Sequence, residues 1–218
     1  MGKKIVIDAC VAIDLNIPKI NFLGEFLSCC NDDQILISST NYGEIHDYTI
    51  LRLLENSDNV EIIDDDNSAF DNFYSELKSL RLGLGRNDGH VLFRANESNA
   101  EFIVSSDFNV YDKARQFKKI KSLSYMNPMT TVTLLAYIYE QGKIGYSIFL
   151  DKTLRLYKYK EIDNMLEHLS EEDLNVSKPS QKEIIDEFKQ SMKERFQDYK
   201  EPLITEFRHL LALGRLPT

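Results

Sequence analysis

The stretch KKIVIDACVAIDL, residues 3–15, decides how the fold of this chain is interpreted. Its apolar run Ile5–Ile7 is short and β-branched, which favours a buried strand. The run ends at Asp8 and leads directly into a helix-like pattern. An acid at such a junction commonly starts a helix. At the carboxyl end of a parallel strand, however, the same position faces the edge of the sheet where ligands bind. The stretch therefore predicts a strand-to-helix unit in which Asp8 is either a helix cap or part of a site.

Similar short apolar runs recur along the first two thirds of the chain. Further strands are predicted at Ile35–Ile37, Val60–Ile63, Phe102–Val104 and near Lys121–Ser124. Helices are predicted from the capping residues 38–41 to about Glu55, over 67–81, over about 88–97, after Asp107 and after Pro128. This alternation predicts an α/β domain, about residues 1–145, with a central, mostly parallel sheet flanked by helices.

Beyond Gly145 the pattern changes to helices without a clear strand. Residues 146–218 are therefore predicted to form a helical C-terminal extension. One apolar stripe within it contains Ile184, Ile185, Phe188, Met192 and Phe196. Such a stripe indicates packing on the core, or a docking surface for a second subunit or a partner helix.

Composition excludes several classes of protein. No run of about 18 uncharged apolar residues is present, so no transmembrane helix is expected. The N-terminus enters a strand pattern without the features of a signal peptide, so a cytoplasmic protein without membrane contact is expected. The three cysteines cannot all pair with one another, and none has a CxxC spacing. Small buried thiols are the expected outcome.

The formal net charge of -9 disfavours charge-driven binding of nucleic acid over the whole surface. A local basic patch is nevertheless present after Asp107, made up of Lys113, Arg115, Lys118, Lys119 and Lys121. It is either a solvated helix face or a surface that contacts phosphates. A second cluster, Lys152, Arg155, Lys158 and Lys160, would extend this surface.

Four acids stand where the predicted fold gathers side chains. Asp8 and Asp107 follow strands, Glu44 lies early in the helix after the second strand, and Asp88 begins a helix. Strand ends and the following helix starts share one edge of a parallel sheet, so the four carboxylates are expected to converge. Carboxylates in such proximity repel one another unless cations compensate. Mg²⁺ or Mn²⁺ suits such oxygen ligands and activates water for attack on a phosphodiester.

The order of these motifs resembles that of PIN-domain nucleases. The segments are VIDACVAIDL, SSTNYGEI, LGLGRNDGHVLFRAN, FIVSSDFNVYDKA and YMNPMTTVTLLAYIYEQGKI, and they cover about residues 3–145. The resemblance implies a PIN-like fold and a metal-dependent nuclease, foremost an endoribonuclease acting on RNA or single-stranded nucleic acid. It further implies that Asp8, Asp88 and Asp107 hold the metal and that Glu44 completes the catalytic set. Ser106 would orient a ligand or water, and Lys113, Arg115 and Lys118 would contact the substrate.

The chain also departs from this family. Cys10 stands where Ser, Thr or Asn is usual, and Gly89 and His90 stand where small apolar residues are usual. Many small PIN proteins are toxins, so an antitoxin protein and a homo-oligomer are conceivable partners by analogy. The alternative is a catalytically inactive PIN-like module for binding or assembly that acts through its C-terminal helices.

Other polar residues are given ordinary roles. Asp14 is expected to be a surface or capping acid, and the run Asp64, Asp65 and Asp66 is expected to form a solvated turn. His90 follows Asp88 by two positions on the same predicted helix, and an ordinary surface or core histidine is expected there.

Overall fold

The computed structural model of this chain describes residues 2–18, 20–65, 67–145, 148–149, 151–152 and 155–156, with only the backbone of Asn67 and Phe108. The chain divides into the units Met1–Lys152 and Thr153–Thr218, and every element below belongs to the first. The predicted C-terminal extension and its apolar stripe lie almost entirely outside the described residues, as do Lys158 and Lys160.

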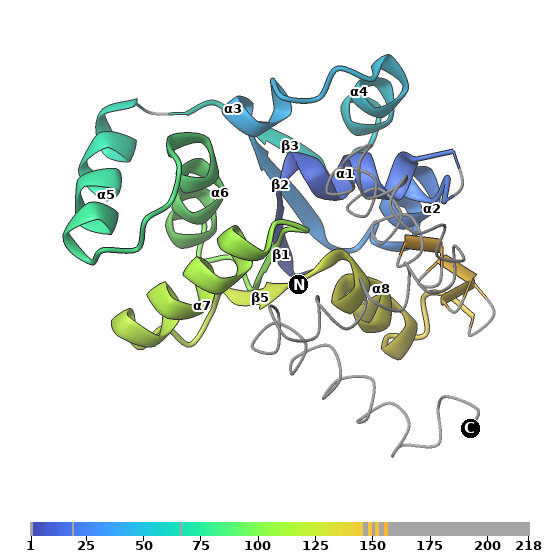
Figure 1. The fold of residues 1–218 in the computed structure, drawn as a ribbon. Coiled ribbons are helices and arrows are strands. Elements are labelled where there is room, and N and C mark those ends of the chain that lie inside the picture. The colour runs from blue at the N-terminus through green and yellow to red at the C-terminus, as the bar shows by residue number, and fades with distance from the viewer. Residues whose placement is uncertain are drawn as a thin grey trace, which may run out of the picture. The chain divides into compact units, whose positions relative to one another are not determined.

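Strands and helices alternate along the first unit (Figure 1). The strands are β1 (Lys4–Ile7), β2 (Gln34–Ser38), β3 (Val60–Ile63), β4 (Phe102–Val104) and β5 (Asn127–Met129). The helices are α1 (Ala9–Asn16), α2 (Leu23–Cys29), α3 (Ser39–Tyr42), α4 (Tyr48–Glu55), α5 (Asn67–Ser79), α6 (Arg86–Glu97), α7 (Phe108–Lys121) and α8 (Thr131–Glu140). None of these described helices has the length and apolar character needed to cross a membrane.

The five strands form one sheet in the order β3-β2-β1-β4-β5, and every pair is parallel. The predicted α/β fold with a helix-flanked parallel sheet is thereby confirmed. Strand β1 is central, with Val6 opposite Leu36 of β2 and Ile7 opposite Val104 of β4. The chain builds outward from β1 in both directions, so the order of the strands reverses between β1 and β4. Ligands of open α/β sheets bind beyond the carboxyl ends of the strands at such a point.

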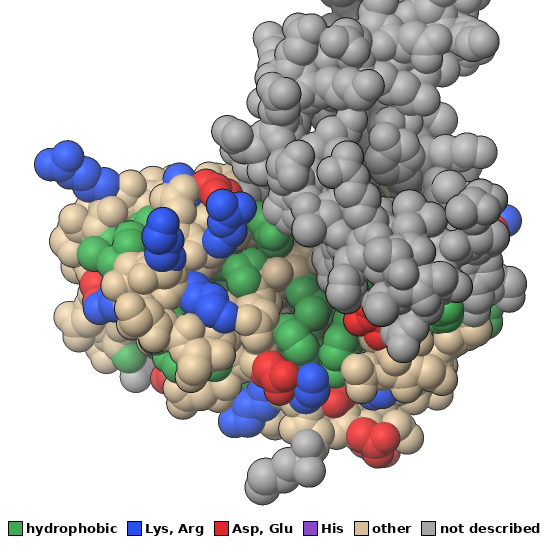
Figure 2. Space-filling model, turned by 90° about the horizontal axis from the view of Figure 1, so that it is seen from below, with side chains coloured by type: hydrophobic (Ala, Val, Ile, Leu, Met, Phe, Trp, Pro, Cys, Tyr) green, Lys and Arg blue, Asp and Glu red, His purple; other side chains and the backbone are tan. Residues whose placement is uncertain are grey.

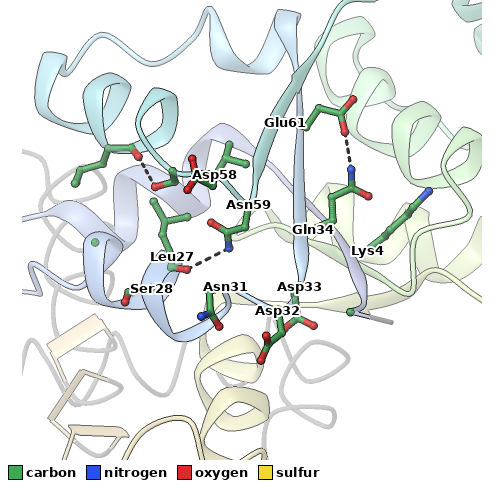
Figure 3. A pocket seen from close by; sticks show the side chains of 15 residues that line it. Lys4, Leu27, Ser28, Asn31, Asp32, Asp33, Gln34, Asp58, Asn59 and Glu61 are labelled. Carbon is green, nitrogen blue, oxygen red and sulfur yellow. Dashed lines mark hydrogen bonds between the residues drawn. The ribbon is translucent and has the colours of Figure 1, made fainter.

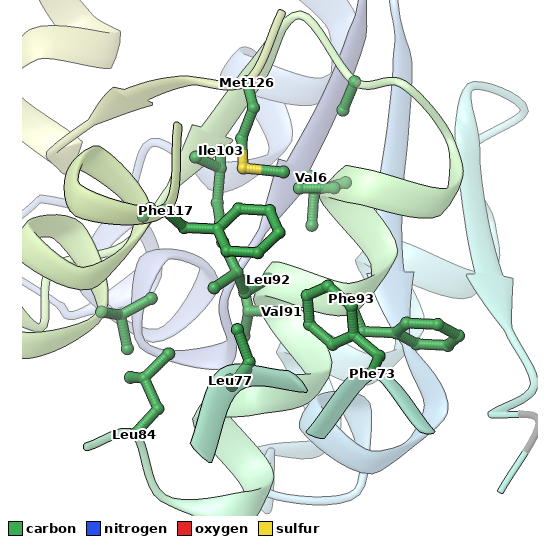
Figure 4. Close-up of a cluster of buried hydrophobic side chains, with 14 of the residues drawn as sticks. Val6, Phe73, Leu77, Leu84, Val91, Leu92, Phe93, Ile103, Phe117 and Met126 are labelled. Carbon is green, nitrogen blue, oxygen red and sulfur yellow. The ribbon is translucent and has the colours of Figure 1, made fainter. Parts of the chain in front are cut away.

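Burial explains why these short runs become strands. Residues 5–7 of β1 and 35–37 of β2 are at most 1% exposed, as expected for parallel strands covered on both faces. Helices α5, α6 and α7 cover one face of the sheet, while α1, α2 and α8 lie on the other side (Figure 1). The core on the first face includes Val6, Phe73, Leu92, Phe117 and Met126 (Figure 4).

The strand predicted near Lys121–Ser124 is wrong. Helix α7 continues to Lys121 and ends at Ser122, which has a left-handed backbone with φ 53°. A residue in this conformation is a common helix terminator. The last strand, β5, lies further along the chain and contains Pro128. A proline has no N–H to donate to a neighbouring strand, and β5 tolerates it because this strand lies at the edge of the sheet.

The single helix predicted from residues 38–41 to about Glu55 is also wrong, because two helix starts lie within it. Ser38 caps α3 by accepting a hydrogen bond from the Asn41 N–H at 3.1 Å. Asp47 caps α4 by accepting one from the Thr49 N–H at 2.7 Å. The break places Glu44 in the connection between α3 and α4. Helix α6, in turn, begins at Arg86, so Asp88 lies within its first turn.

Candidate functional site

The carboxyl ends of β1 and β4 lie side by side and carry two of the predicted acids. The Asp8 N–H donates to the Val104 carbonyl at 3.0 Å, which extends the pairing of the two strands to the end of β1. Asp107 follows β4 after two serines. Both acids therefore stand at the point where the strand order reverses.

Electrostatics shows that Glu44 and Asp88 join them. Burial raises the pKa of Asp88, and the charges of Asp107, Asp8 and Glu44 raise it further. Burial is also the main cause of the raised pKa of Asp8, to which the charge of Glu44 adds. The four predicted acids therefore lie close enough for their charges to interact. Asp8 is buried, Asp88 is half-buried, and Glu44 and Asp107 are exposed, so the cluster opens to solvent.

Asp8 occupies the N-cap position of α1, but its side chain does not cap the helix. Its Oδ2 accepts hydrogen bonds from the Ser105 hydroxyl at 2.7 Å and from the Cys10 thiol at 3.2 Å. Asp8 is only 6% exposed, and hydrogen bonds from these two side chains hold its carboxylate. Its position is therefore not explained by helix capping.

Ser105 links the two strand-end acids, and the sequence did not single it out. Its hydroxyl donates to Asp8 and accepts a hydrogen bond from the Asp107 N–H at 3.0 Å. Ser106, which was expected to orient a ligand, instead donates to the Asp14 carboxylate and contacts the Thr131 hydroxyl. The signal that could have favoured Ser105 is its position directly after the buried strand β4.

Cys10 stands where PIN-domain nucleases, which the sequence resembles, usually have a hydroxyl or an amide. Burial, together with the nearby Asp8 charge, raises the pKa of Cys10 to about 12. The side chain is therefore a neutral thiol that can donate to Asp8, while its sulfur accepts from the Ser106 N–H at 3.2 Å. The substitution retains a donor beside Asp8. All three cysteines are free, Cys30 is buried, and Cys10 and Cys29 are half-buried.

Two asparagines hold the remaining acids in place. The Asn87 side-chain amide donates to Glu44 Oε1 at 2.6 Å, and the Asn41 amide donates to the Asn87 carbonyl at 3.4 Å. These contacts join the end of α3 to the first turn of α6, which carries Asp88. Gly85 precedes this turn, and a Cβ there would lie 3.2 Å from Asp88 Oδ2. The asparagine contacts were not predicted, because they join parts of the chain 43 or more residues apart.

Asp107 has a structural role in addition to its place in the cluster. One of its oxygens, Oδ1, caps α7 by accepting a hydrogen bond from the Asn109 N–H at 2.7 Å. The interpretation of this acid as a helix cap is therefore correct for that oxygen. Capping also fixes the carboxyl at the sheet edge, where its charge acts on Asp88.

The cluster suits Mg²⁺ or Mn²⁺ in its chemistry. Its donors are carboxylate oxygens, and burial together with the charges of the neighbouring acids raises the pKa of Asp88. Among the described residues, no three His, Cys, Asp or Glu side chains are placed to hold one ion between them. Mg²⁺ commonly binds proteins through only one or two carboxylates and keeps several waters, so a set of three is not required. The four acids therefore fit the ion as donors.

Two expectations about other acids are wrong. Asp14 is not at the surface but 6% exposed, since its carboxylate lies against the hydroxyls of Ser106 and Thr131. Asp65 is not part of a solvated turn, because its side chain is 6% exposed and contacts Arg94. Asp64 is exposed, and Asp66 lies outside the described residues. His90 is a buried core histidine, as expected, and stacks on Phe70 with ring centroids 3.5 Å apart.

The basic residues after Asp107 extend along α7, and Figure 2 shows Lys and Arg side chains over the part of the surface where this helix lies. Lys113 is paired with Asp112 at 3.6 Å, and Arg115 is exposed. Lys118 donates to Asn127 at the start of β5. The starts of the parallel strands form the edge of the sheet opposite to the acids, which follow the strand ends. At about 1.5 Å per residue Lys118 lies roughly 16 Å along the helix from Asp107. Lys118 is therefore not beside the acids.

A pocket of about 970 Å³ lies at this opposite edge, away from the acids (Figure 3). The starts of β1, β2 and β3 line it with Lys4, Gln34 and Glu61. Gln34 donates to Glu61 at 2.6 Å, and the Asn59 amide donates to two backbone carbonyls. Most of the amide donors in this pocket are thus already used within the protein.

Comparison of the chain with protein-family models, with curated proteins and with solved structures found no match.

Proposed function

We propose that this chain is a metal-dependent nuclease with a PIN-like fold, foremost an endoribonuclease. The observation that carries the proposal is the convergence of Asp8, Glu44, Asp88 and Asp107 at the reversal point of a parallel sheet. Four acids from distant parts of the chain are unlike a set of unrelated helix caps, since the charges of Asp107, Asp8 and Glu44 add to burial in raising the pKa of Asp88. Perturbed pKa values of this kind are common at functional sites.

Each side chain has a role in this proposal. Asp8, Asp88 and Asp107 would bind Mg²⁺ or Mn²⁺, one or two of them directly and the remainder through the waters that such an ion keeps. The ion would activate water and offset charge on the phosphodiester. Glu44 completes the acidic set, and Asn87 orients its carboxylate. Ser105 and Cys10 orient Asp8 by donating to the same oxygen. A fixed carboxylate keeps its ligand oxygen in place without reorganisation.

The substrate proposed for this site is RNA or another single-stranded nucleic acid. The cluster opens to solvent through Glu44 and Asp107, which gives a polymer access to it. Lys113 and Arg115 lie on the helix that begins at Asp107 and can contact phosphates on either side of the cleaved bond. A role as a cytoplasmic toxin that is neutralised by an antitoxin protein, and a homo-oligomeric state, belong to the same proposal.

Cleavage of a fluorescent single-stranded RNA tests the proposal. We expect cleavage in Mn²⁺ or Mg²⁺ that stops when a chelator is added. Asp8→Asn and Asp88→Asn should each lower the rate by more than the roughly 100-fold typical of losing an outer-shell partner of a metal. Circular dichroism would verify that both variants are folded.

Asp58→Asn is the matched control, because Asp58 is an exposed acid that lines the pocket at the opposite edge. It should cleave at the wild-type rate. Cleavage that persists in chelator, or that is unchanged in both site variants, would contradict the proposal. A folded wild-type chain that binds RNA without cleaving it would favour the module for binding or assembly.

A further inference from the structure

Asp65 is a buried acid outside the acidic cluster, and its two oxygens serve different elements. Oδ2 accepts hydrogen bonds from the Thr40 N–H at 2.9 Å and the Ser39 hydroxyl at 3.2 Å, both in α3. Oδ1 lies 3.2 Å from Arg94 Nε and 3.2 Å from His90 Nδ1, both in α6. One carboxylate from the segment after β3 therefore joins the start of α3 to the middle of α6.

The surroundings of this junction keep water away from it. The side chains of Asp65, His90 and Arg94 are 6%, 4% and 4% exposed, and the Phe70 ring stacks on the imidazole. Burial lowers the pKa of His90, and the hydrogen bonds from Thr40 help to lower that of Asp65. Arg94 also donates to the Asp64 carbonyl, which fixes the segment that carries Asp65. Charge-assisted hydrogen bonds in such a water-poor setting give a rigid connection.

The same two elements carry two acids of the candidate site. Helix α6 has Asp88 in its first turn, and α3 leads within two residues of its end to Glu44. Near the site the Asn41 side-chain amide donates to the Asn87 backbone carbonyl at 3.4 Å, and the Asn87 side-chain amide donates to Glu44 at 2.6 Å. Helix α3 has four residues and is too short to be stable by itself. Its position against α6 therefore depends on contacts at both of its ends.

We propose that Asp65 is a positioning residue, which holds α3 against α6 through Arg94 and thereby sets Glu44 opposite Asp88. His90 Nδ1 lies 3.2 Å from the same oxygen but makes no hydrogen bond to it. The inference rests on the proposed function for its consequence in metal binding, whereas the connection of α3 to α6 is independent of it. Within the part of the chain that the structure describes, Asp65 makes no hydrogen bond to the acids of the site, so it would act on them through α3.

The test compares Asp65→Asn with Glu97→Gln. Glu97 is an exposed partner of the same Arg94 at the far end of α6, and among the described residues it makes no hydrogen bond or ion pair with α3. Three quantities are measured in both variants: hydrogen exchange of the Thr40 amide, the NMR signal of the Asn87 side-chain amide, and Mn²⁺ affinity by calorimetry. The first two report on α3 and on the Asn87–Glu44 contact without any metal.

In Asp65→Asn we expect exchange at Thr40 to accelerate at least tenfold, the Asn87 signal to shift, and the Mn²⁺ dissociation constant to rise by about 10-fold, as for an outer-shell residue. In Glu97→Gln all three should stay within about twofold of wild type, because Glu97 is exposed to solvent screening and Arg94 keeps its contacts with Asp65 and the Asp64 carbonyl. If Asp65→Asn does not fold, Ser39→Ala removes only the hydroxyl contacts and should shift the same quantities by a smaller factor.

Equal behaviour of Asp65→Asn and Glu97→Gln at Thr40 and Asn87 would overturn the inference. Faster exchange at Thr40 with an unmoved Asn87 signal would also overturn it, because Asp65 would then hold α3 without setting Glu44. If the wild-type chain binds no Mn²⁺, the proposed metal site fails, and the Thr40 and Asn87 measurements alone decide the role of Asp65.

Discussion

Asp8 owes its environment to two neighbours that share one of its oxygens. Ser105 reaches it from β4 and Cys10 from α1, and neither contact is a helix cap. The thiol replaces a hydroxyl as donor without becoming a thiolate, because its pKa is about 12. Cys10 therefore leaves Asp8 with a hydrogen-bonded carboxylate.

Asp88 should reduce the stability of the metal-free protein at neutral pH. The pKa of Asp88 in the folded chain lies above the unfolded value of 3.8, because burial and the charges of three neighbouring carboxylates oppose its ionisation. A raised carboxyl pKa contributes stability below the unfolded pKa, and this contribution is lost as pH rises through the folded pKa. Asp88→Asn removes the charge, so its midpoint of thermal unfolding should exceed that of wild type by an amount that grows from about pH 4 upward and then levels off.

Differential scanning calorimetry in chelator at low salt between pH 4 and 8 measures this difference. Asp58→Asn, at an exposed acid away from the cluster, serves as the control and should show no such trend. A difference that shrinks toward neutral pH would mean that the carboxylates do not repel one another as the structure indicates.

At the scale of elements, the break between α3 and α4 places Glu44. The segment 38–55 has continuous helical character in sequence, yet Ser38 and Asp47 each start a helix there. The connection between the two helices turns Glu44 toward Asn87 at the start of α6. A continuous helix would have carried this residue in a helical turn, so capping chemistry decides where one of the four acids lies.

Asp47→Ala tests this account of the break. Loss of an N-cap acceptor costs about 1 kcal/mol, so the free energy of unfolding should fall by that amount in a urea titration. Asp47→Asn retains an acceptor oxygen and should remain close to wild type. Equal losses in the two variants would mean that charge, and not the hydrogen bond to the Thr49 N–H, starts α4.

At the scale of the whole molecule, the net charge of -9 and the acidic cluster act in the same direction. Carboxylates are gathered beyond the carboxyl ends of β1 and β4, and they accept hydrogen bonds from the side chains of Ser105, Cys10 and Asn87 and from the Asn109 N–H. A cation that binds the folded chain and not the unfolded one must therefore stabilise the fold.

Thermal unfolding with and without Mn²⁺ measures this linkage. At a concentration about 100-fold above the dissociation constant, one bound ion should add about 2.7 kcal/mol, and the unfolding midpoint should rise. Asp8→Asn should lose most of this increment, while Asp58→Asn should keep it. An increment that is the same in both variants would place the ion outside the cluster.

The sequence by itself determined the alternation of strands and helices, and it placed an acid after each of two buried strands. These features follow from local causes, namely apolar runs, capping residues and the period of each element. The convergence of Asp8, Glu44, Asp88 and Asp107 could be predicted as well, because parallel strands and the helices after them share one edge.

Only the tertiary structure decided which polar residues support the acids. Ser105, Asn41 and Asn87 make their contacts across 43 to 97 positions of sequence, and Asp65 is buried because Arg94 reaches it from 29 residues away. The strand order likewise placed β5 at an edge, where Pro128 is tolerated. Contacts of this kind depend on how the elements pack, and no local pattern records them. The acidic run of residues 64–66 therefore does not reveal in sequence that an arginine packs against one of its side chains.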